Sequence, residues 1–163
     1  MARRIAADLG AADPPGKDAY DRNAEAFARR ATQVFDELRR AVADLPNKRI
    51  ITQHDVFDLF ARDLGLEIAG VINAHAGHDP SAAEVSRLVR LARTANVGAV
   101  MTEPQYPPRL GQTIAREAGI GAGSLDPVAS GPDDAPLDYY ERTMRGNVAA
   151  LRKALVTSRE PAP

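Results

Sequence analysis

Residues 50–55 read IITQHD, and the ten residues behind them carry apolar side chains at helical spacing. A short run of β-branched residues is typical of a buried strand, and steps of three and four are typical of a helix. This stretch therefore predicts a strand over residues 49–52, then His54, then a helix over residues 55–64. Ligands bind at the carboxyl ends of strands in open parallel sheets, so His54 is the first candidate functional residue. The alternative is that His54 only caps the helix or bonds a backbone carbonyl.

The same alternation of strand and helix continues along the chain. Further strands are predicted at residues 68–73, 99–102 and 121–125, and further helices at residues 81–92, 109–118 and 137–155. The helix at residue 81 opens with a capping box formed by Ser81 and Glu84. Parallel strands need crossover helices, so this alternation predicts an α/β fold with a four-stranded parallel sheet flanked by helices.

One long helix is predicted ahead of the sheet. From residue 17 to about residue 44, apolar side chains recur in steps of three and four, which is the pattern of an amphipathic helix. At 1.5 Å per residue such a helix is roughly 40 Å long. The sequence DPPG at residues 13–16 predicts a turn before it, and residues 2–9 have the pattern of the last turns of another helix.

Composition narrows the classes of function. The chain has 163 residues, of which 44% are hydrophobic and 26% charged, with a net charge of −1 and no cysteine. The balanced charge argues against a nucleic-acid partner, and the lack of thiols means that any metal must be held by histidine and carboxylate. No stretch approaches the ~20 apolar residues of a membrane span, and the first residues lack the apolar core of a secretory signal.

Side chains that can bind metals follow the predicted strands. They are His54, His75, His78, Glu103 and Asp126. The carboxyl ends of parallel strands meet at one edge of a sheet, so we expect imidazoles and carboxylates to gather there. Such a mixture of nitrogen and oxygen donors suits a borderline divalent cation. Each residue also has a purely structural alternative: to close a turn, to cap backbone amides, or to be solvated in a loop.

Several motifs, taken in order, resemble the metal-binding substrate-binding proteins of ABC transporters, the zinc/manganese uptake family. The segments that carry the resemblance are ITQHDVF at 51–57, HDPSAAE at 78–84, EPQY at 103–106 and LDP at 125–127, together with Tyr139, Asn147 and Leu151. The resemblance runs from about residue 2 to residue 155 and so covers nearly the whole chain.

The resemblance implies two α/β lobes joined by one long helix, with a single metal ion in the cleft between them. It divides the chain into residues 1–16, a remnant of the first lobe and a turn; residues 17–45, the linking helix; residues 46–157, the second α/β lobe; and residues 158–163, a frayed tail. The resemblance implies that the first lobe, which supplies two further histidine ligands in this family, is missing apart from its last helix, and that a signal peptide is missing too. We therefore expect a truncated protein.

The resemblance also implies roles for single residues. His54 matches the histidine ligand of the second lobe and Asp126 its carboxylate ligand. His75 lies in the loop from which some members supply an additional ligand, and Glu103 lies where the family keeps a glutamate beside the site. The implied cargo is zinc or manganese, and an imidazole-rich ligand set favours zinc. The implied partner is a membrane permease, with the protein in the periplasm or outside the cell at the membrane.

Two consequences and two competing interpretations remain. Four ligands complete a zinc site, so we expect weak binding unless His75, water or another chain completes it. An exposed lobe interface would favour self-association.

One alternative function is a metal-assisted hydrolase that uses His54 and a carboxylate on a bound water, although no nucleophile elbow or Walker loop is present. The other is an assembly module in which these residues are only structural.

Overall fold

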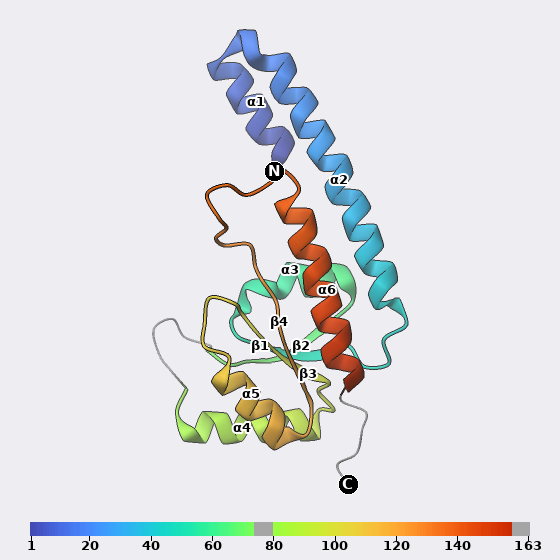
Figure 1. The fold of residues 1–163 in the computed structure, drawn as a ribbon, viewed down its shortest axis with the longest axis vertical. Coiled ribbons are helices and arrows are strands. Elements are labelled where there is room, and N and C mark those ends of the chain that lie inside the picture. The colour runs from blue at the N-terminus through green and yellow to red at the C-terminus, as the bar shows by residue number, and fades with distance from the viewer. Residues whose placement is uncertain (74–79, 158–163) are drawn as a thin grey trace. The chain divides into compact units, whose positions relative to one another are not determined.

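The computed structural model describes residues 1–73 and 80–157, and it divides the chain into two compact units, Met1–Glu37 and Leu38–Pro163. Figure 1 shows the path of the chain. The predicted frayed tail and the loop that carries His75 and His78 lie outside the described residues. None of the helices in the described ranges is long and apolar enough to cross a membrane.

The first unit is a helical hairpin. Helix α1 (Ala2–Ala12) is joined by a short 3-10 helix (Pro14–Gly16) to helix α2 (Lys17–Ala43), which continues into the second unit. The turn is stabilised by the Tyr20 hydroxyl, which donates to Asp13 Oδ2 at 2.7 Å. The predicted long helix is confirmed, and it ends at Ala43, slightly earlier than predicted.

The second unit contains the predicted parallel sheet. Its strands are β1 (Arg49–Thr52), β2 (Glu67–Val71), β3 (Ala99–Thr102) and β4 (Gly121–Ser124), hydrogen-bonded in the order β2-β1-β3-β4. All three pairings are parallel, which confirms the predicted fold class. Ile50, Ile51 and Thr52 of β1 are fully buried, because a central strand has both faces covered.

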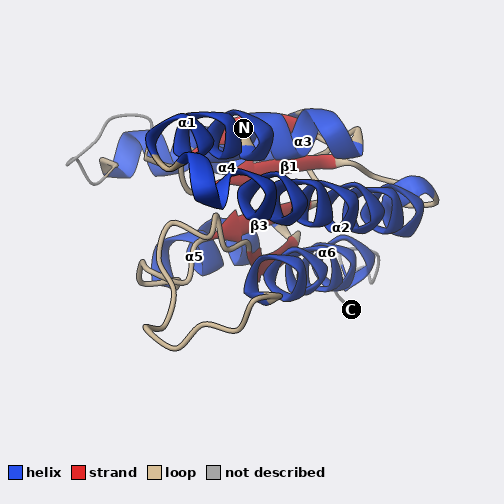
Figure 2. Cartoon of the chain, turned by 90° about the horizontal axis from the view of Figure 1, so that it is seen from above, coloured by secondary structure: helices blue, strands red, loops and turns tan. Residues whose placement is uncertain are grey.

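Helices cover both faces of the sheet (Figures 1 and 2). Helices α4 (Ala82–Thr94) and α5 (Arg109–Ala118) pack on one face, where Leu88 and Ile114 meet Ile51 and Val100. Helices α3 (Asp58–Leu64) and α6 (Tyr139–Thr157) cover the other face. The end of α2 lies beside both of these helices: Arg39 donates to the backbone oxygen of Asp63, and Arg152 pairs with Asp44 at 2.8 Å.

Several element boundaries differ from the predictions. The helix predicted from Asp55 opens as a 3-10 turn (Asp55–Phe57) before α3 begins. Strand β2 ends at Val71, two residues before the predicted end, although the backbone amide of Asn73 still donates to Gln53 O at 2.9 Å. The capping box is confirmed, since the backbone amide of Ser81 donates to the Glu84 carboxylate at 2.8 Å.

Packing explains why strand β4 is rich in glycine. A Cβ on Gly121 would lie 1.9 Å from the backbone oxygen of Ala154 in α6. A Cβ on Gly123 would lie 2.8 Å from the Met101 side chain. Strand β4 therefore carries small residues because α6 approaches its backbone directly, and this approach sets the position of α6 against β4.

Candidate metal centre

His54 is bound through its side chain to Glu103. His54 follows β1 in an extended conformation, and the Thr52 hydroxyl donates to its backbone oxygen at 2.8 Å. The ring nitrogen Nδ1 lies 2.8 Å from Glu103 Oε1, and the two side chains are 20% and 6% exposed. When the carboxylate is ionised it only accepts hydrogen bonds, so Nδ1 of a neutral imidazole donates to it and Nε2 keeps its lone pair for a metal. The imidazole makes no capping bond to the helix that follows.

A single turn after β3 organises this part of the site. The turn EPQY, residues 103–106, is closed by a backbone hydrogen bond of 3.1 Å from the amide of Tyr106 to Glu103 O. The Tyr106 ring packs against the His54 ring with a centroid distance of 4.6 Å and a tilt of 56°. Glu103 and Tyr106 therefore restrain the imidazole from two sides, and Gln105 of the same turn reaches toward the next strand.

Asp126 follows β4 and is bonded through both its backbone and its side chain. Its backbone amide donates to Asn147 Oδ1 and its backbone oxygen accepts from Asn147 Nδ2, each at 2.8 Å. Its carboxylate oxygen Oδ1 accepts from the backbone amide of Val128 at 2.8 Å and from Gln105 Nε2 at 3.4 Å. The partly exposed carboxylate is therefore held at one oxygen.

The order of the strands explains which residues come together. His54, Glu103 and Asp126 follow the neighbouring strands β1, β3 and β4, all at the carboxyl edge of the sheet. His54 and Glu103 are in contact, and Gln105 links their turn to Asp126. Across residues 1–73 and 80–157, no three His, Cys, Asp or Glu side chains converge as a ready metal cluster. His75 lies outside those ranges, so its predicted role stays a prediction.

A hollow of about 400 Å³ lies beside Tyr106. Its lining residues are Gln53, Asn73, Pro80, Tyr106, Pro107, Arg109, Leu110 and Thr113. Gln53 Oε1 and Asn73 Oδ1 are buried there and have no hydrogen-bond partner among the described residues. Gln53 follows β1 and Asn73 follows β2. In the sequence, the only indication of this hollow was that each of these polar residues comes directly after a run of mostly apolar residues.

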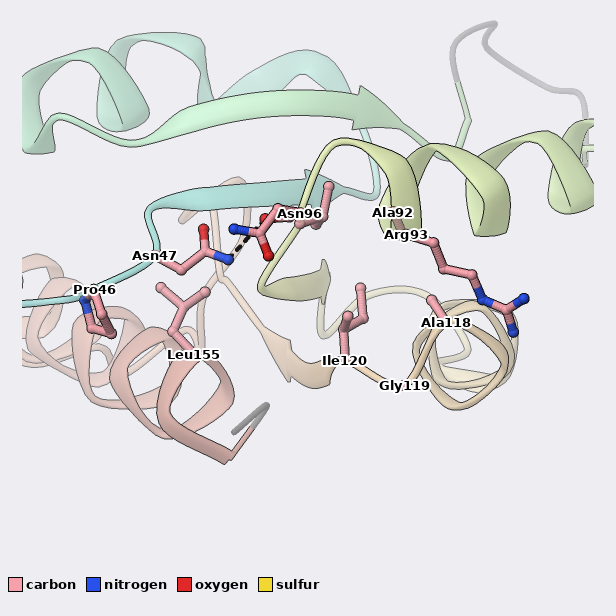
Figure 3. Close-up of a pocket in the computed structure, with 10 residues that line it drawn as sticks. Pro46, Asn47, Ala92, Arg93, Asn96, Ala118, Gly119, Ile120 and Leu155 are labelled. Carbon is pink, nitrogen blue, oxygen red and sulfur yellow. Dashed lines mark hydrogen bonds between the residues drawn. The ribbon is translucent and has the colours of Figure 1, made fainter. Parts of the chain in front are cut away.

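A second hollow, of about 430 Å³, lies at the opposite, amino edge of the sheet (Figure 3). There Asn47 Nδ2 donates to the backbone oxygen of Asn96 at 2.8 Å, and Asn47 Oδ1 accepts from the backbone amide of Arg49 at 3.0 Å. His54, Glu103 and Asp126, the predicted metal-binding residues that the structure describes, do not line this hollow. It is separate from the candidate metal centre.

Sequence reasoning did not assign a role to three residues that shape the centre. Gln105, Tyr106 and Asn147 belong to the segments that carry the family resemblance, but no spacing rule shows which atoms they touch. Their partners become visible only when β1, β3, β4 and α6 are assembled.

A family model and several known proteins match nearly the whole chain. A family model described as "Zinc-uptake complex component A periplasmic" matches residues 1–154. The high-affinity zinc uptake system protein ZnuA of Brucella abortus (strain 2308) is 27% identical over 155 residues, which cover 95% of this chain and 46% of that protein. ZnuA of Bacillus subtilis is 27% identical over 158 residues, covering 94% of this chain and 49% of that protein. The chain thus spans about half the length of these relatives.

Solved structures of metal-binding proteins share the fold. The substrate-binding protein FpvC of Pseudomonas aeruginosa in complex with Ni²⁺ has a TM-score of 0.81 and 28% identity, covering 98% of this chain and 59% of that chain. FpvC in complex with Mn²⁺ has a TM-score of 0.80 and 29% identity, covering 94% and 58%. The laminin-binding protein Lmb of Streptococcus agalactiae, described as a bifunctional protein with adhesin and metal transporting activity, has a TM-score of 0.78 and 26% identity, covering 93% and 58%. These comparisons give no support to the hydrolase alternative.

Proposed function

Because the chain belongs to the family of the periplasmic zinc-uptake complex component A, we propose that it binds a divalent transition metal for delivery to an ABC-type membrane permease. The observation that carries this proposal is the 2.8 Å bond between His54 Nδ1 and Glu103 Oε1 at the carboxyl edge of the sheet. A carboxylate behind the imidazole orients the ring and raises its strength as a ligand, which is the usual arrangement around a metal-binding histidine.

The proposed ligands are His54, through Nε2, and Asp126, through Oδ2, the carboxylate oxygen to which no described residue donates a hydrogen bond. Glu103 does not contact the metal but holds His54. His75 is proposed as an additional ligand, and water or residues elsewhere in the full protein would supply the remaining positions. Zinc accepts four nitrogen and oxygen ligands in a tetrahedral arrangement, and these residues would supply part of that set.

Zinc is the proposed cargo in preference to manganese. Imidazole is a good ligand for zinc, whereas manganese favours sites made of carboxylate, carbonyl and water oxygens. The names of the ZnuA relatives refer to zinc uptake, which supports the same choice. The structures of FpvC with nickel and manganese support a divalent cation in general.

Domain organisation and location are proposed from the family. We propose that residues 17–45, which contain α2 (Lys17–Ala43), link the α/β lobe at residues 46–157 to another lobe, of which residues 1–16 are a part. The proposed location is outside the cytoplasm, in keeping with the word "periplasmic" in the description of the family. We further propose that this chain self-associates through the exposed lobe interface, the apolar surface on α1 and α2 that would otherwise meet the rest of that lobe.

Zinc titration of single variants tests the metal centre. We expect His54→Ala and Asp126→Ala to weaken zinc binding by more than the roughly 10–100-fold that loss of an outer-shell partner costs, because each removes a ligand. Binding would be measured by competition with a chromogenic chelator. The control is Glu117→Ala, which removes a carboxylate that is 57% exposed at the end of α5, at the other edge of the sheet. Equal zinc affinity in all variants would refute the assignment.

A further inference from the structure

We propose that Asn147 and the backbone amide of Val128 hold Asp126 as a one-oxygen metal ligand, and that this restraint favours zinc over manganese. The inference rests on the proposed function and adds to it a determinant of metal choice. It makes Asn147 a positioning residue, since Asn147 would act on the metal only through Asp126.

Asn147 takes the place of a neighbouring strand for Asp126. The last sheet-like bond beside β4 runs from the backbone amide of Leu125 to Thr102 O at 2.8 Å. The sheet ends at the next residue, Asp126, whose two backbone groups bond to the side chain of Asn147 instead. Asn147 Oδ1 accepts from the backbone amide of Asp126, and Asn147 Nδ2 donates to the backbone oxygen of Asp126, each at 2.8 Å. Two bonds of opposite sense allow only one orientation of the side-chain amide. Asn147 is 4% exposed, so the bonds are shielded from competing water.

The helix that carries Asn147 is itself held against β4. The contact between Gly121 and the backbone of Ala154, two turns further along α6, leaves no room for a Cβ. Any residue with a Cβ at position 121 would force α6 away from the strand. The position of Asn147 relative to Asp126 therefore depends on the packing of α6 against the sheet.

The side chain of Asp126 is restrained at one oxygen only. Oδ1 accepts from the amide of Val128 at 2.8 Å and from Gln105 Nε2 at 3.4 Å. No residue in the described part of the chain donates a hydrogen bond to Oδ2. Val128 has a φ of +58°, a left-handed conformation that is costly for a β-branched residue. Such strain persists only when the surroundings enforce it.

A carboxylate held in this way has one oxygen left for a metal. Zinc sites with four ligands need one oxygen from each carboxylate. Manganese prefers octahedral, oxygen-rich coordination, for which a carboxylate that can offer both oxygens is more useful. Withdrawing Oδ1 into hydrogen bonds therefore costs manganese more binding free energy than it costs zinc.

The experiment compares zinc and manganese binding to the whole chain in Asn147→Leu, which keeps the size of the side chain and removes both hydrogen bonds. We expect zinc affinity to fall roughly 10–100-fold, as for other residues that orient a ligand, and manganese affinity to fall less. The ratio of zinc affinity to manganese affinity is therefore expected to fall. Bound Co²⁺, used as a spectroscopic probe, should lose intensity in its visible absorption bands as its coordination number rises above four.

The matched control is Asn47→Leu. Asn47 makes the same kind of two-way bond to the backbone, through Arg49 N and Asn96 O, at the amino edge of the sheet (Figure 3). We expect it to change the stability of the protein without changing the metal ratio or the Co²⁺ spectrum. Should Asn147→Leu fail to fold, Asn147→Asp serves in its place, because it keeps the acceptor for the Asp126 amide and loses the donor to its backbone oxygen. A smaller change of the same sign is expected.

The outcomes separate this inference from the proposed function. If Asp126→Ala binds zinc as well as the wild type, the metal centre itself is wrong. If Asp126→Ala loses zinc while the folded Asn147 variant keeps both the metal ratio and the Co²⁺ spectrum, only the positioning role is overturned. Equal losses for zinc and manganese in the Asn147 variant would also overturn it, because they would indicate a structural role alone.

Discussion

At the scale of single residues, the centre depends on hydrogen bonds behind the metal-binding atoms. Glu103 is 5% exposed, and its carboxylate has the His54 imidazole as a partner at 2.8 Å. A buried carboxylate is stable only when it is well bonded, so Glu103 and His54 depend on each other. His54 is thereby fixed in direction even though it stands at the exposed edge of the sheet.

Glu103→Gln tests this dependence. The neutral amide gives a weaker bond to Nδ1 and no longer fixes which ring nitrogen carries the proton, so we expect zinc affinity to fall about 10–100-fold. Chelator competition at neutral pH measures the change, and circular dichroism checks that the fold is kept. Glu117→Gln, at the other edge of the sheet, is the control. Unchanged zinc affinity in Glu103→Gln would show that His54 needs no support from Glu103.

At the scale of elements, the close contact of α6 and β4 positions one half of the centre. Strand β4 has the sequence GAGS, which has low strand propensity. It is a strand because it pairs with β3 and because α6 can approach only a backbone without side chains on that face. The same approach brings Asn147 to Asp126.

Gly121→Ala should therefore disturb both stability and metal binding. The added Cβ would lie 1.9 Å from the backbone oxygen of Ala154, and overpacking against a backbone costs about 1–3 kcal/mol or more. The measurement is urea unfolding without metal, followed by zinc titration of the folded fraction. Gly146→Ala is the matched control: it lies in α6, where an added Cβ would meet no atom within 4 Å, and it should stabilise the helix by about 0.5–1 kcal/mol. Equal stabilities for the two variants would contradict the packing argument.

At the scale of the whole molecule, the first unit presents an apolar surface. A hollow of about 420 Å³ on the α1 and α2 hairpin is lined by Met1, Ala2, Ile5, Ala6, Leu9, Tyr20, Asn23, Ala24 and Phe27. Ile5 is 52% exposed and Leu9 45% exposed. Contiguous apolar side chains at a surface mark sites of association. Here the proposed occupant is the same hairpin of a second copy of the chain.

Ile5→Asp tests self-association. A charge in an apolar contact is poorly solvated, so we expect the dimer to dissociate about tenfold or more readily. Sedimentation velocity over a range of protein concentrations measures the change. Ala7→Asp places the same charge on an exposed position of α1 that does not line the hollow, and it should leave association unchanged. A wild-type chain that is monomeric at all concentrations would refute the proposal.

Local sequence patterns determined the order of the elements and the class of the fold. Periodicity of apolar residues depends on neighbours a few positions apart, so it can be recognised without coordinates. The sequence alone predicted the strand from the run IIT, the start of a helix from the capping box at Ser81, and the long helix from the apolar stripe that begins at residue 17. Parallel topology then predicted that His54, Glu103 and Asp126 would follow strands at one edge. The weaker boundaries, at Asp55 and Asn73, were wrong by two or three residues because the ends of elements depend on tertiary hydrogen bonds.

Only the tertiary structure decided how the side chains meet. His54 and Glu103 are 49 residues apart in the chain, and Asp126 and Asn147 are 21 apart. Their bonds depend on the direction of each side chain after the sheet has formed and α6 has settled on β4. Sequence periodicity determines which face of an element is buried, but it does not specify which polar atoms will lie within hydrogen-bonding distance across two elements.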